Sequence, residues 1–339
     1  MTPVTQMLGQ LIETLTPEVE KIRLPLCHLL IMFGKSEATH PRDRLFAFLG
    51  LAADGDALSL RPSYDEPVES VFLRYARYFI ETGDGIRLLY QSSGILNKEI
   101  SIPSWVPDWT QSEKRPLNQI ATHGLFYKAA ANTSPQIRCA NDEKEIVISR
   151  VHVDIVSKTA IYSPGDPFDS DDWFLNLQNI FTEVDSFILN RESYVTGEPL
   201  FDVLWKTLIG NASADTSFAA PEEYGQQYHV CRKIVEDIKQ EGLFPRLEDT
   251  NSYFKRLFSM IDMYKLCETR TGLVGMVPLD TVVGDSVYIF AGSGLPFILR
   301  PNAELQNKYE VVGGCYIHGV MNGELVGSDK WREEDVTLL

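Results

Sequence analysis

The sequence predicts an α+β protein with a helical N-terminal region and a small antiparallel β-barrel that a helical insertion interrupts. Apolar residues recur at helical spacing early in the chain, change to alternation after Gly124, and return to helical spacing from Trp173. From Arg270 to Gly327, short β-branched and aromatic runs alternate with glycine-rich turn signals. The expected parts are a helical region at 1–118, a barrel at 119–160 and 267–330, and an insertion at 161–266.

Composition limits the kinds of partner. The 339 residues carry a net charge of −16, which argues against a nucleic-acid backbone or an anionic membrane as the main partner. The longest apolar run, Leu24–Phe33, is too short to span a bilayer, and Pro25 interrupts it. The N-terminus lacks the basic start and cleavage site of a secretory signal, so we expect a cytoplasmic protein.

The cysteines indicate neither zinc nor redox chemistry. They are odd in number, widely separated and without a C-x-x-C pair, so we expect buried thiols in a reducing compartment, with no metal and no cofactor. The five are Cys27, Cys139, Cys231, Cys267 and Cys315.

Four helices are expected in the first part of the chain. They cover Met7–Leu15, Leu24–Phe33, Thr39–Gly50 and the stripe from Val68 to Phe79. Pro41 and Asp43 suit the first turn of the third helix, and Gly83 ends the fourth. The segment Ile102–Trp109, IPSWVPDW, is too rich in proline for a regular element and too aromatic for a solvated linker. We therefore predict a packed, extended strap there.

The second part begins with strands, continues with helices and ends with strands. The expected strands are Leu125–Ala131, Gln136–Cys139 and Glu145–Lys158, then Ser286–Ala291, Phe297–Arg300, Tyr309–Gly313 and Cys315–Val320. The expected helices are Trp173–Leu189, Leu200–Ile209, Glu222–Gln240 and Asn251–Leu266. A change of phase predicts a bulge near Ser149–Arg150. Asn322–Gly323 suits a two-residue hairpin turn, and Gly292–Gly294 predicts a turn rather than a nucleotide-binding fingerprint.

Three blocks of sequence resemble fungal heterokaryon-incompatibility (HET) proteins. The first two are SEATHPRDRLFAFLGLA (36–52) and IPSWVPDW (102–109). The third consists of the three stretches TRTGLVGMVP, GDSVYIFAGSGLPFILR and YEVVGGCYIHGVMNGE. The blocks occur in the order found in that family, in the region that follows its N-terminal signature domain. The resemblance implies fungal origin, a cytoplasmic role in self/non-self recognition, and a link to programmed cell death after incompatible fusion.

The sequence departs from the family pattern at its start. In HET proteins, a domain with an aromatic Leu-Ser-Tyr-x-Trp-Gly type of signature precedes the Pro-Arg-Asp block. Here that block, Pro41–Asp43, comes soon after Met1. We therefore expect the C-terminal barrel region without most of the HET domain with which cell killing is associated.

Candidate ligand-binding residues lie in the first two blocks. Arg42 and Arg44 could bind a phosphate or carboxylate at a helix start. They could instead form a capping and ion-pair cluster with Asp108, which ties the helix to the strap, and we favour this reading. Trp105 and Trp109 could stack on a planar ligand, although aromatic residues in a proline strap usually act as packing anchors.

His318 is the main catalytic candidate in the strands. Cys315 lies three positions earlier, which places the two side chains on opposite faces of a strand, so a nucleophile–base pair would need a bulge. Glu324 follows the Asn322–Gly323 turn and could meet His318 across it. A solvated or structural pair is the reading that we favour.

The acidic run Asp169–Asp172 is a second catalytic candidate. Asp171 and Asp172 precede an apolar helical stretch, and clustered carboxylates facing an apolar cavity can hold Mg²⁺ and a diphosphate, as in isoprenoid cyclases. The plainer alternative is a helix cap that suits the helix dipole. Asn190, Ser193 and Glu198 do not have the spacing of a second metal site of that kind. We therefore expect no metal.

The sequence contains no G-x-S-x-G, H-E-x-x-H or P-loop motif. Our first hypothesis is therefore a non-catalytic recognition or regulatory module of the HET family with a protein partner, which full-length relatives could provide. The alternative is a stand-alone enzyme of fungal secondary metabolism, a cyclase or isomerase with its cavity in the barrel or beside the insertion. A third hypothesis is a decoy that binds full-length relatives. A small-molecule ligand is left open.

Overall fold

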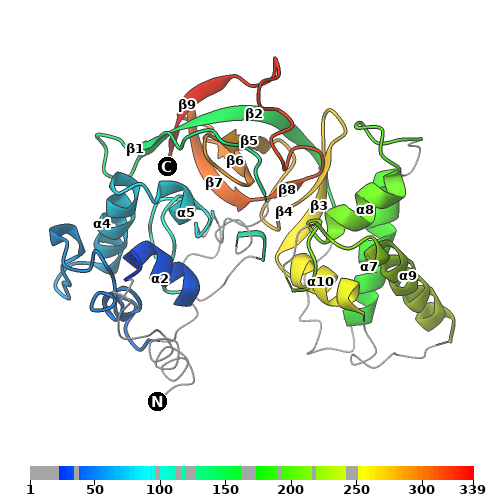
Figure 1. The fold of residues 1–339 in the computed structure, drawn as a ribbon, viewed down its shortest axis with the longest axis horizontal. Helices are drawn as coiled ribbons and strands as arrows, with labels where there is room; N and C mark the ends of the chain where they lie inside the picture. Colours follow the sequence, from blue (N-terminus) through cyan, green and yellow to red (C-terminus); the bar gives the residue numbers. More distant parts are fainter. Residues whose placement is uncertain are drawn as a thin grey trace, which may run out of the picture.

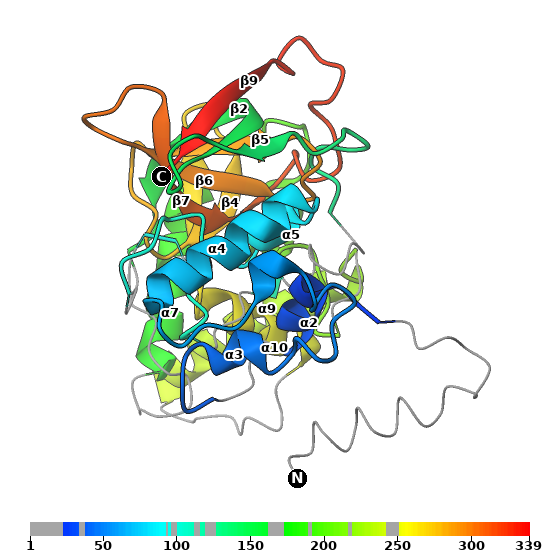
Figure 2. The same ribbon diagram turned by 90° about the vertical axis from the view of Figure 1, so that its left-hand side faces the viewer.

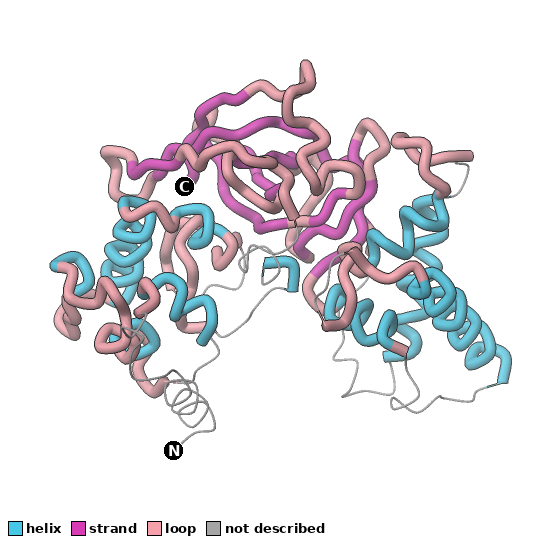
Figure 3. The backbone as a smooth tube through the Cα atoms, viewed as in Figure 1, coloured by secondary structure: helices cyan, strands magenta, loops and turns pink. Residues whose placement is uncertain are grey.

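The structure is a computed structural model that describes residues 23–33, 38–92, 94–95, 100–111, 116–118, 127–161, 173–188, 192–215, 219–241 and 251–339. The protein is α+β, as predicted. A curved sheet occupies the top of Figure 1, and one group of helices lies below it on each side. Figure 3 shows the same separation of strands from helices. The expected helix at Met7–Leu15 and the acidic run Asp169–Asp172 lie outside the described residues.

The helical N-terminal region packs against one side of the sheet (Figure 2). Its elements are α2 (Leu26–Phe33), α3 (Asp43–Phe46), the short 3-10 helix η1 (Leu58–Leu60), α4 (Val68–Glu81) and α5 (Gly85–Leu89). Helix α4 buries the predicted stripe, including Phe72, Tyr75 and Phe79. Gly83 ends it with a φ of 95°, a conformation that glycine adopts without strain. The third expected helix is shorter than predicted, because only the single turn of α3 forms.

The strap Ile102–Trp109 is packed and has neither helix nor strand, as predicted. Trp105 is 0% exposed, and its indole N–H donates to the Lys144 carbonyl at 2.9 Å. Trp109 meets the Phe72 ring edge to face, with 5.1 Å between centroids. The strap therefore joins helix α4 to the start of the sheet.

The described strands form one sheet that contains a closed ring. They are β1 (Ile137–Cys139), β2 (Ile146–Thr159), β3 (Tyr264–Thr269), β4 (Val274–Pro278), β5 (Ser286–Phe290), β6 (Pro296–Pro301), β7 (Lys308–Gly314), β8 (Tyr316–Ile317) and β9 (Glu333–Leu338). Strand β2 pairs with β5 and with β9, and the order β5–β6–β7–β9 completes the circuit. Strands β3, β4 and β8 continue the sheet from the far end of β2.

Strand β2 holds the ring together because different parts of it pair with different strands. Its first residues pair with β1 and β9, its middle pairs with β5, and its end pairs with β3. The register shifts between His152 and Asp154 opposite β5. The bulge predicted near Ser149–Arg150 is therefore displaced, since both residues keep regular pairing with β9.

One pairing in the ring is parallel. Strand β9 runs parallel to β7, whereas the other pairings between the described ring strands are antiparallel. Parallel neighbours cannot be joined by a tight turn and need a long connection. Here the chain passes through β8 and the long segment after it before it returns as β9 beside β7. Gly323 has a φ of 83°, the positive value expected of a turn. No strand follows it until Glu333, so this described stretch does not form the predicted two-residue hairpin.

Alternate residues of the ring strands enter two different cores. In β6, Phe297 and Leu299 join the large core that includes both helical groups, whereas Ile298 joins a second core with Val287 and Val312. Successive side chains of a strand point to opposite faces, so this division follows from the backbone. One face of the ring strands therefore packs against the helices, and the other packs in the second core, which the strands and their connections form.

The helical insertion lies at the other side of the sheet (Figure 1). It contains α7 (Trp173–Ile188), α8 (Leu200–Leu208), α9 (Glu223–Glu241) and α10 (Ser252–Ile261). Asn251 caps α10 by accepting from the Phe254 N–H at 2.9 Å. The carbonyls after α8 are capped by side chains: Arg256 Nε donates to Ile209 at 3.1 Å, and the Tyr127 hydroxyl donates to Gly210.

Two expected elements differ in this region. The helix predicted to run to Leu266 ends at Ile261, and Tyr264–Thr269 is strand β3, which pairs with both β2 and β4. Residues 127–131, predicted as part of a strand, are irregular at 127–128 and form turns at 129–131. The sheet occupies 137–159 and 264–338, with α7–α10 between, and the division into three domains stays a prediction.

No helix in the described part of the chain is both long enough and apolar enough to cross a bilayer.

Candidate functional site

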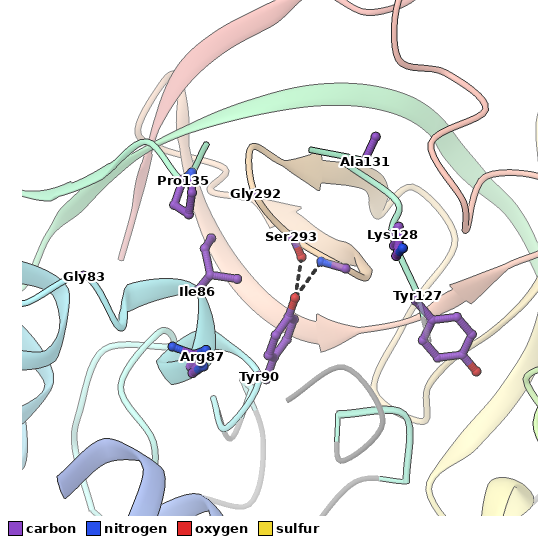
Figure 4. A pocket seen from close by; sticks show the side chains of 11 residues that line it. Gly83, Ile86, Arg87, Tyr90, Tyr127, Lys128, Ala131, Pro135, Gly292 and Ser293 are labelled. Carbon is purple, nitrogen blue, oxygen red and sulfur yellow. Dashed lines mark hydrogen bonds between the residues drawn. The ribbon is translucent and has the colours of Figure 1, made fainter. Parts of the chain in front are cut away.

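An open cleft of about 280 Å³ lies where the N-terminal helices meet the strand ring (Figure 4). Three segments line it: the end of α4 through α5, residues 127–135, and the turn between β5 and β6. The lining residues are Gly83, Ile86, Arg87, Tyr90, Tyr127, Lys128, Ala131, Pro135, Gly292, Ser293 and Gly294. The cleft therefore combines parts of the chain that are distant in sequence.

Glycines allow the β5–β6 turn to approach its neighbours closely. Gly292 has a φ of 77°, and a Cβ atom there would lie 2.5 Å from the Pro135 ring. A Cβ atom on Gly294 would lie 2.6 Å from the Tyr127 carbonyl oxygen. Larger residues would thus push the turn away from residues 127–135.

Tyr90 fixes helix α5 to this turn. Its ring stacks on Phe297 of β6, with 5.8 Å between centroids. Its hydroxyl oxygen accepts from the Gly294 N–H at 2.7 Å and lies 3.1 Å from Ser293 Oγ, as the dashed lines in Figure 4 show. Ser293 Oγ in turn donates to the Leu295 carbonyl at 2.7 Å. These hydroxyls already have partners, so they hold the wall of the cleft in place.

Burial raises the pKa of Tyr90, so its phenol stays protonated at neutral pH. With the Gly294 N–H donating to its oxygen and Ser293 donating to Leu295, the Tyr90 proton is directed to Ser293 Oγ. The cleft thus has no activated phenolate at this position.

Two cationic side chains, Arg87 and Lys128, lie on opposite sides of the cleft (Figure 4). Arg87 pairs with Asp84 at 2.8 Å, and both cations are exposed. Among the described residues, no ion pair engages the Lys128 ammonium group. In a chain with a net charge of −16, this places local positive charge at the cleft.

His318 is held between the ring and the insertion. Its Nε2 lies 3.0 Å from Glu198 Oε2, just before α8, and its Nδ1 lies 3.0 Å from the Tyr316 hydroxyl. The Tyr194 hydroxyl donates to the His318 carbonyl at 2.9 Å and accepts from the Val274 N–H at 3.0 Å. These contacts link the insertion to β4 and β8.

Both ring nitrogens of His318 are therefore engaged, and the residue is 6% exposed. Desolvation lowers the pKa of His318, although Glu198 opposes the shift. Neutral His318 has one ring proton, which must be on Nε2, because Glu198 can only accept and the Tyr316 O–H can then donate to Nδ1. This arrangement serves as a structural link.

The other catalytic candidates are placed elsewhere. Glu324 accepts from the Asn322 N–H at 2.7 Å, and Glu198 occupies the position beside His318 that the sequence suggested for Glu324. Cys315 belongs to the second core, and burial raises its pKa well above the ordinary value, so its thiol stays protonated. Asp171 and Asp172 lie outside the described residues.

The candidate binding residues of the first two blocks contact other residues of the N-terminal region or the strap. Arg42 lies 3.0 Å from the His40 ring and donates to the Glu66 carbonyl. The Arg44 Nη1 atom is buried and has no hydrogen-bond partner. Asp108, the expected partner of Arg42 or Arg44, accepts from the Thr110 N–H at 2.9 Å. Neither arginine lines the cleft. Trp105, which is in the core, and Trp109, which packs against the core, do not line it either.

The part of the chain that the structure describes contains no group of three or more His, Cys, Asp or Glu placed to hold a metal ion.

Comparison with known proteins identifies a related family. Residues 231–338 match the Het-6 beta-barrel domain. The chain is also 24% identical, over 359 aligned residues, to "Heterokaryon incompatibility protein 6, OR allele" of Neurospora crassa; the match spans 89% of this chain. The chain covers 51% of that protein, about half its length. No solved structure matches the chain. The predicted resemblance to HET proteins is confirmed.

The matched domain begins within α9 and includes strands β3 to β9. Strand β2, which closes the ring, precedes it.

Proposed function

We propose that this chain, a relative of fungal heterokaryon-incompatibility proteins, is a non-catalytic recognition or regulatory module of vegetative incompatibility. In this proposal it works in the cytoplasm, binds a protein partner through the cleft, and influences the growth arrest or cell death that follows fusion of unlike strains. Full-length relatives are the first partners to test.

The cleft is the observation that carries this proposal. Its buried hydroxyls are engaged in holding the β5–β6 turn, while its two cations are exposed at opposite sides. A site built this way can attract and orient a ligand, but it offers no activated nucleophile or base. His318 supports the same reading, because both its ring nitrogens are already engaged.

The proposal is tested in a fungus that carries the gene. Strains with the gene deleted, restored, or restored with Lys128→Glu are paired with strains of unlike incompatibility type, and barrage formation and vital-dye staining of fused cells are scored. We expect deletion to change the reaction and Lys128→Glu to act like the deletion. Lys330→Glu, which alters an exposed lysine away from the cleft, should act like the unaltered gene.

An unchanged barrage and unchanged staining after deletion would contradict the proposal. Turnover of a fungal metabolite by the purified chain would instead favour the cyclase or isomerase alternative.

A further inference from the structure

We infer that the cleft between α5 and the β5–β6 turn binds an acidic segment of a protein partner, whose carboxylate is attracted by Arg87 on one side of the cleft and by Lys128 on the other. This inference deepens the proposed function and rests on it, because it states the chemistry by which the partner is recognised.

The position of Lys128 is set by its backbone. Its N–H donates to the Met321 carbonyl at 2.8 Å, and its carbonyl accepts from the Ala131 N–H at 2.7 Å. The next residue, Ala129, donates to the Gly294 carbonyl at 3.1 Å. The side chain, by contrast, is exposed. A fixed backbone with a solvated ammonium group holds a positive charge at the mouth of the cleft without the cost of burying it.

Arg87 holds a second charge on the opposite wall. It is on α5, which the hydrogen bond between Tyr90 and Gly294 fixes to the ring. Its guanidinium group forms an ion pair with Asp84. One Nη1 donor faces Asp84 at 2.8 Å, and a guanidinium group has further N–H donors for a second carboxylate. The two basic residues thus lie on opposite sides of the cleft, with Tyr90 and the β5–β6 turn between them (Figure 4). An acidic side chain that enters the cleft is attracted by both.

The size and openness of the cleft favour a peptide segment over a free metabolite. Pockets for small molecules usually have about 300–1,000 Å³ and enclose most of the ligand. Here the volume is about 280 Å³, and Arg87, Lys128, Ala131 and Pro135 are all exposed. A ligand in this cleft keeps one side in water, as a side chain of a bound segment does.

Charge decides which segment enters. The net charge of −16 repels acidic partners at long range. An acidic segment is therefore attracted only close to the surface, within about a Debye length of exposed basic groups. Arg87 and Lys128 provide such a place, and Ile86 and Pro135 add apolar contact beside it. Recognition is thereby limited to acidic residues presented on a segment that fits the cleft.

The test uses the purified 339-residue chain and pooled hexapeptides with random flanks around a fixed central Glu, Gln, Lys or phosphoserine. We expect the Glu pool to be retained over the Gln and Lys pools. Lys128→Gln and Arg87→Gln should each weaken retention about fivefold, as loss of one exposed ion pair does. Lys128→Glu should abolish the preference for Glu, and Lys330→Gln should leave it unchanged.

Equal retention of the Glu and Gln pools, or a Glu preference that survives Lys128→Glu, would overturn the inference. Phosphoserine retained in place of Glu would assign the site to phosphorylated segments, and displacement of every pool by inorganic phosphate alone would assign it to the free ion. Either result would refute the acidic-segment assignment. Glu-specific retention with normal barrage after deletion would leave the binding site standing and refute the proposed function alone.

Discussion

The link between Glu198 and His318 gives the sharpest prediction about stability. Replacing Glu198 by Ala removes the acceptor 3.0 Å from His318 Nε2 and leaves a buried donor without a partner. A hydrogen bond to a charged group contributes about 1.5–3 kcal/mol. The Glu198 side chain is 42% exposed, so solvent screening places the expected loss at the lower end, about 1.5 kcal/mol.

The pH dependence has a definite sign. The pKa of His318 in the folded protein is lower than its ordinary value of 6.5, so the unfolded chain binds the proton more readily. Stability is therefore fully present above pH 6.5 and is lost as the pH falls through the lower folded pKa. Glu198 opposes this shift, so its removal lowers the pKa of His318 further. The gap between wild type and Glu198→Ala should widen from pH 6.5 towards pH 5.

The assay is urea unfolding followed by tryptophan fluorescence from pH 8 to pH 5. Glu324→Ala is the matched control, because Glu324 is the partner that the sequence suggests. Its hydrogen-bond neighbour Asn322 is local, and its charge acts on the pKa of His318 less than that of Glu198. We expect the control to change the free energy of unfolding by less than about 0.5 kcal/mol. Equal losses in the two variants, or a gap that narrows between pH 6.5 and 5, would refute the role assigned to Glu198.

Two further variants test the contacts that shape the cleft and the ring. Tyr90→Phe leaves the Gly294 N–H without its acceptor and should lower the free energy of unfolding by about 1–3 kcal/mol in urea titrations. Tyr64→Phe, at an exposed tyrosine, is the control and should lower it far less. Asp285→Ala removes the 1% exposed partner of Arg300 and should lower the free energy of unfolding by about 3 kcal/mol in the same assay. Asp335→Ala, in the exposed pair with Arg138, should lower it by less than about 1 kcal/mol. A similar loss in both variants would contradict the stabilising role of the buried pair.

Local patterns in the sequence predict many of the elements. The apolar stripe of α4, the helices α7 to α9 and the strands β2, β5, β6 and β7 all lie close to their predicted places, because each buries a periodic set of side chains. The turn at Gly292–Gly294 was also predictable, since positive φ favours glycine.

The misses have physical causes. Strand β9, with the sequence EEDVTL, is acidic, and only Val336 and Leu338 are buried, so its pattern is weak. Its pairing with β2 makes it a strand. Strand β3 begins three residues after α10, with neither glycine nor proline between them to mark the change.

The candidate site was less predictable than the fold. Arg87 and Tyr90 belong to the α5 segment, Lys128 and Ser293 belong to two other segments, and the four share no motif. Glu198 and His318 are likewise distant in sequence, so only the packed insertion brings them together. A local pattern reports which face of an element is buried, but it does not report which distant element covers that face.

The ring also sets an order of events during synthesis. Ile146 pairs with Leu338, so the first strand of the circuit waits for roughly 190 residues before its partner leaves the ribosome, about 10–40 s at usual elongation rates. Throughout this interval, one edge of β2 is available to other strands. A chaperone or a second nascent chain therefore has a long opportunity to bind that edge, and pausing of translation before Glu333 would prolong it.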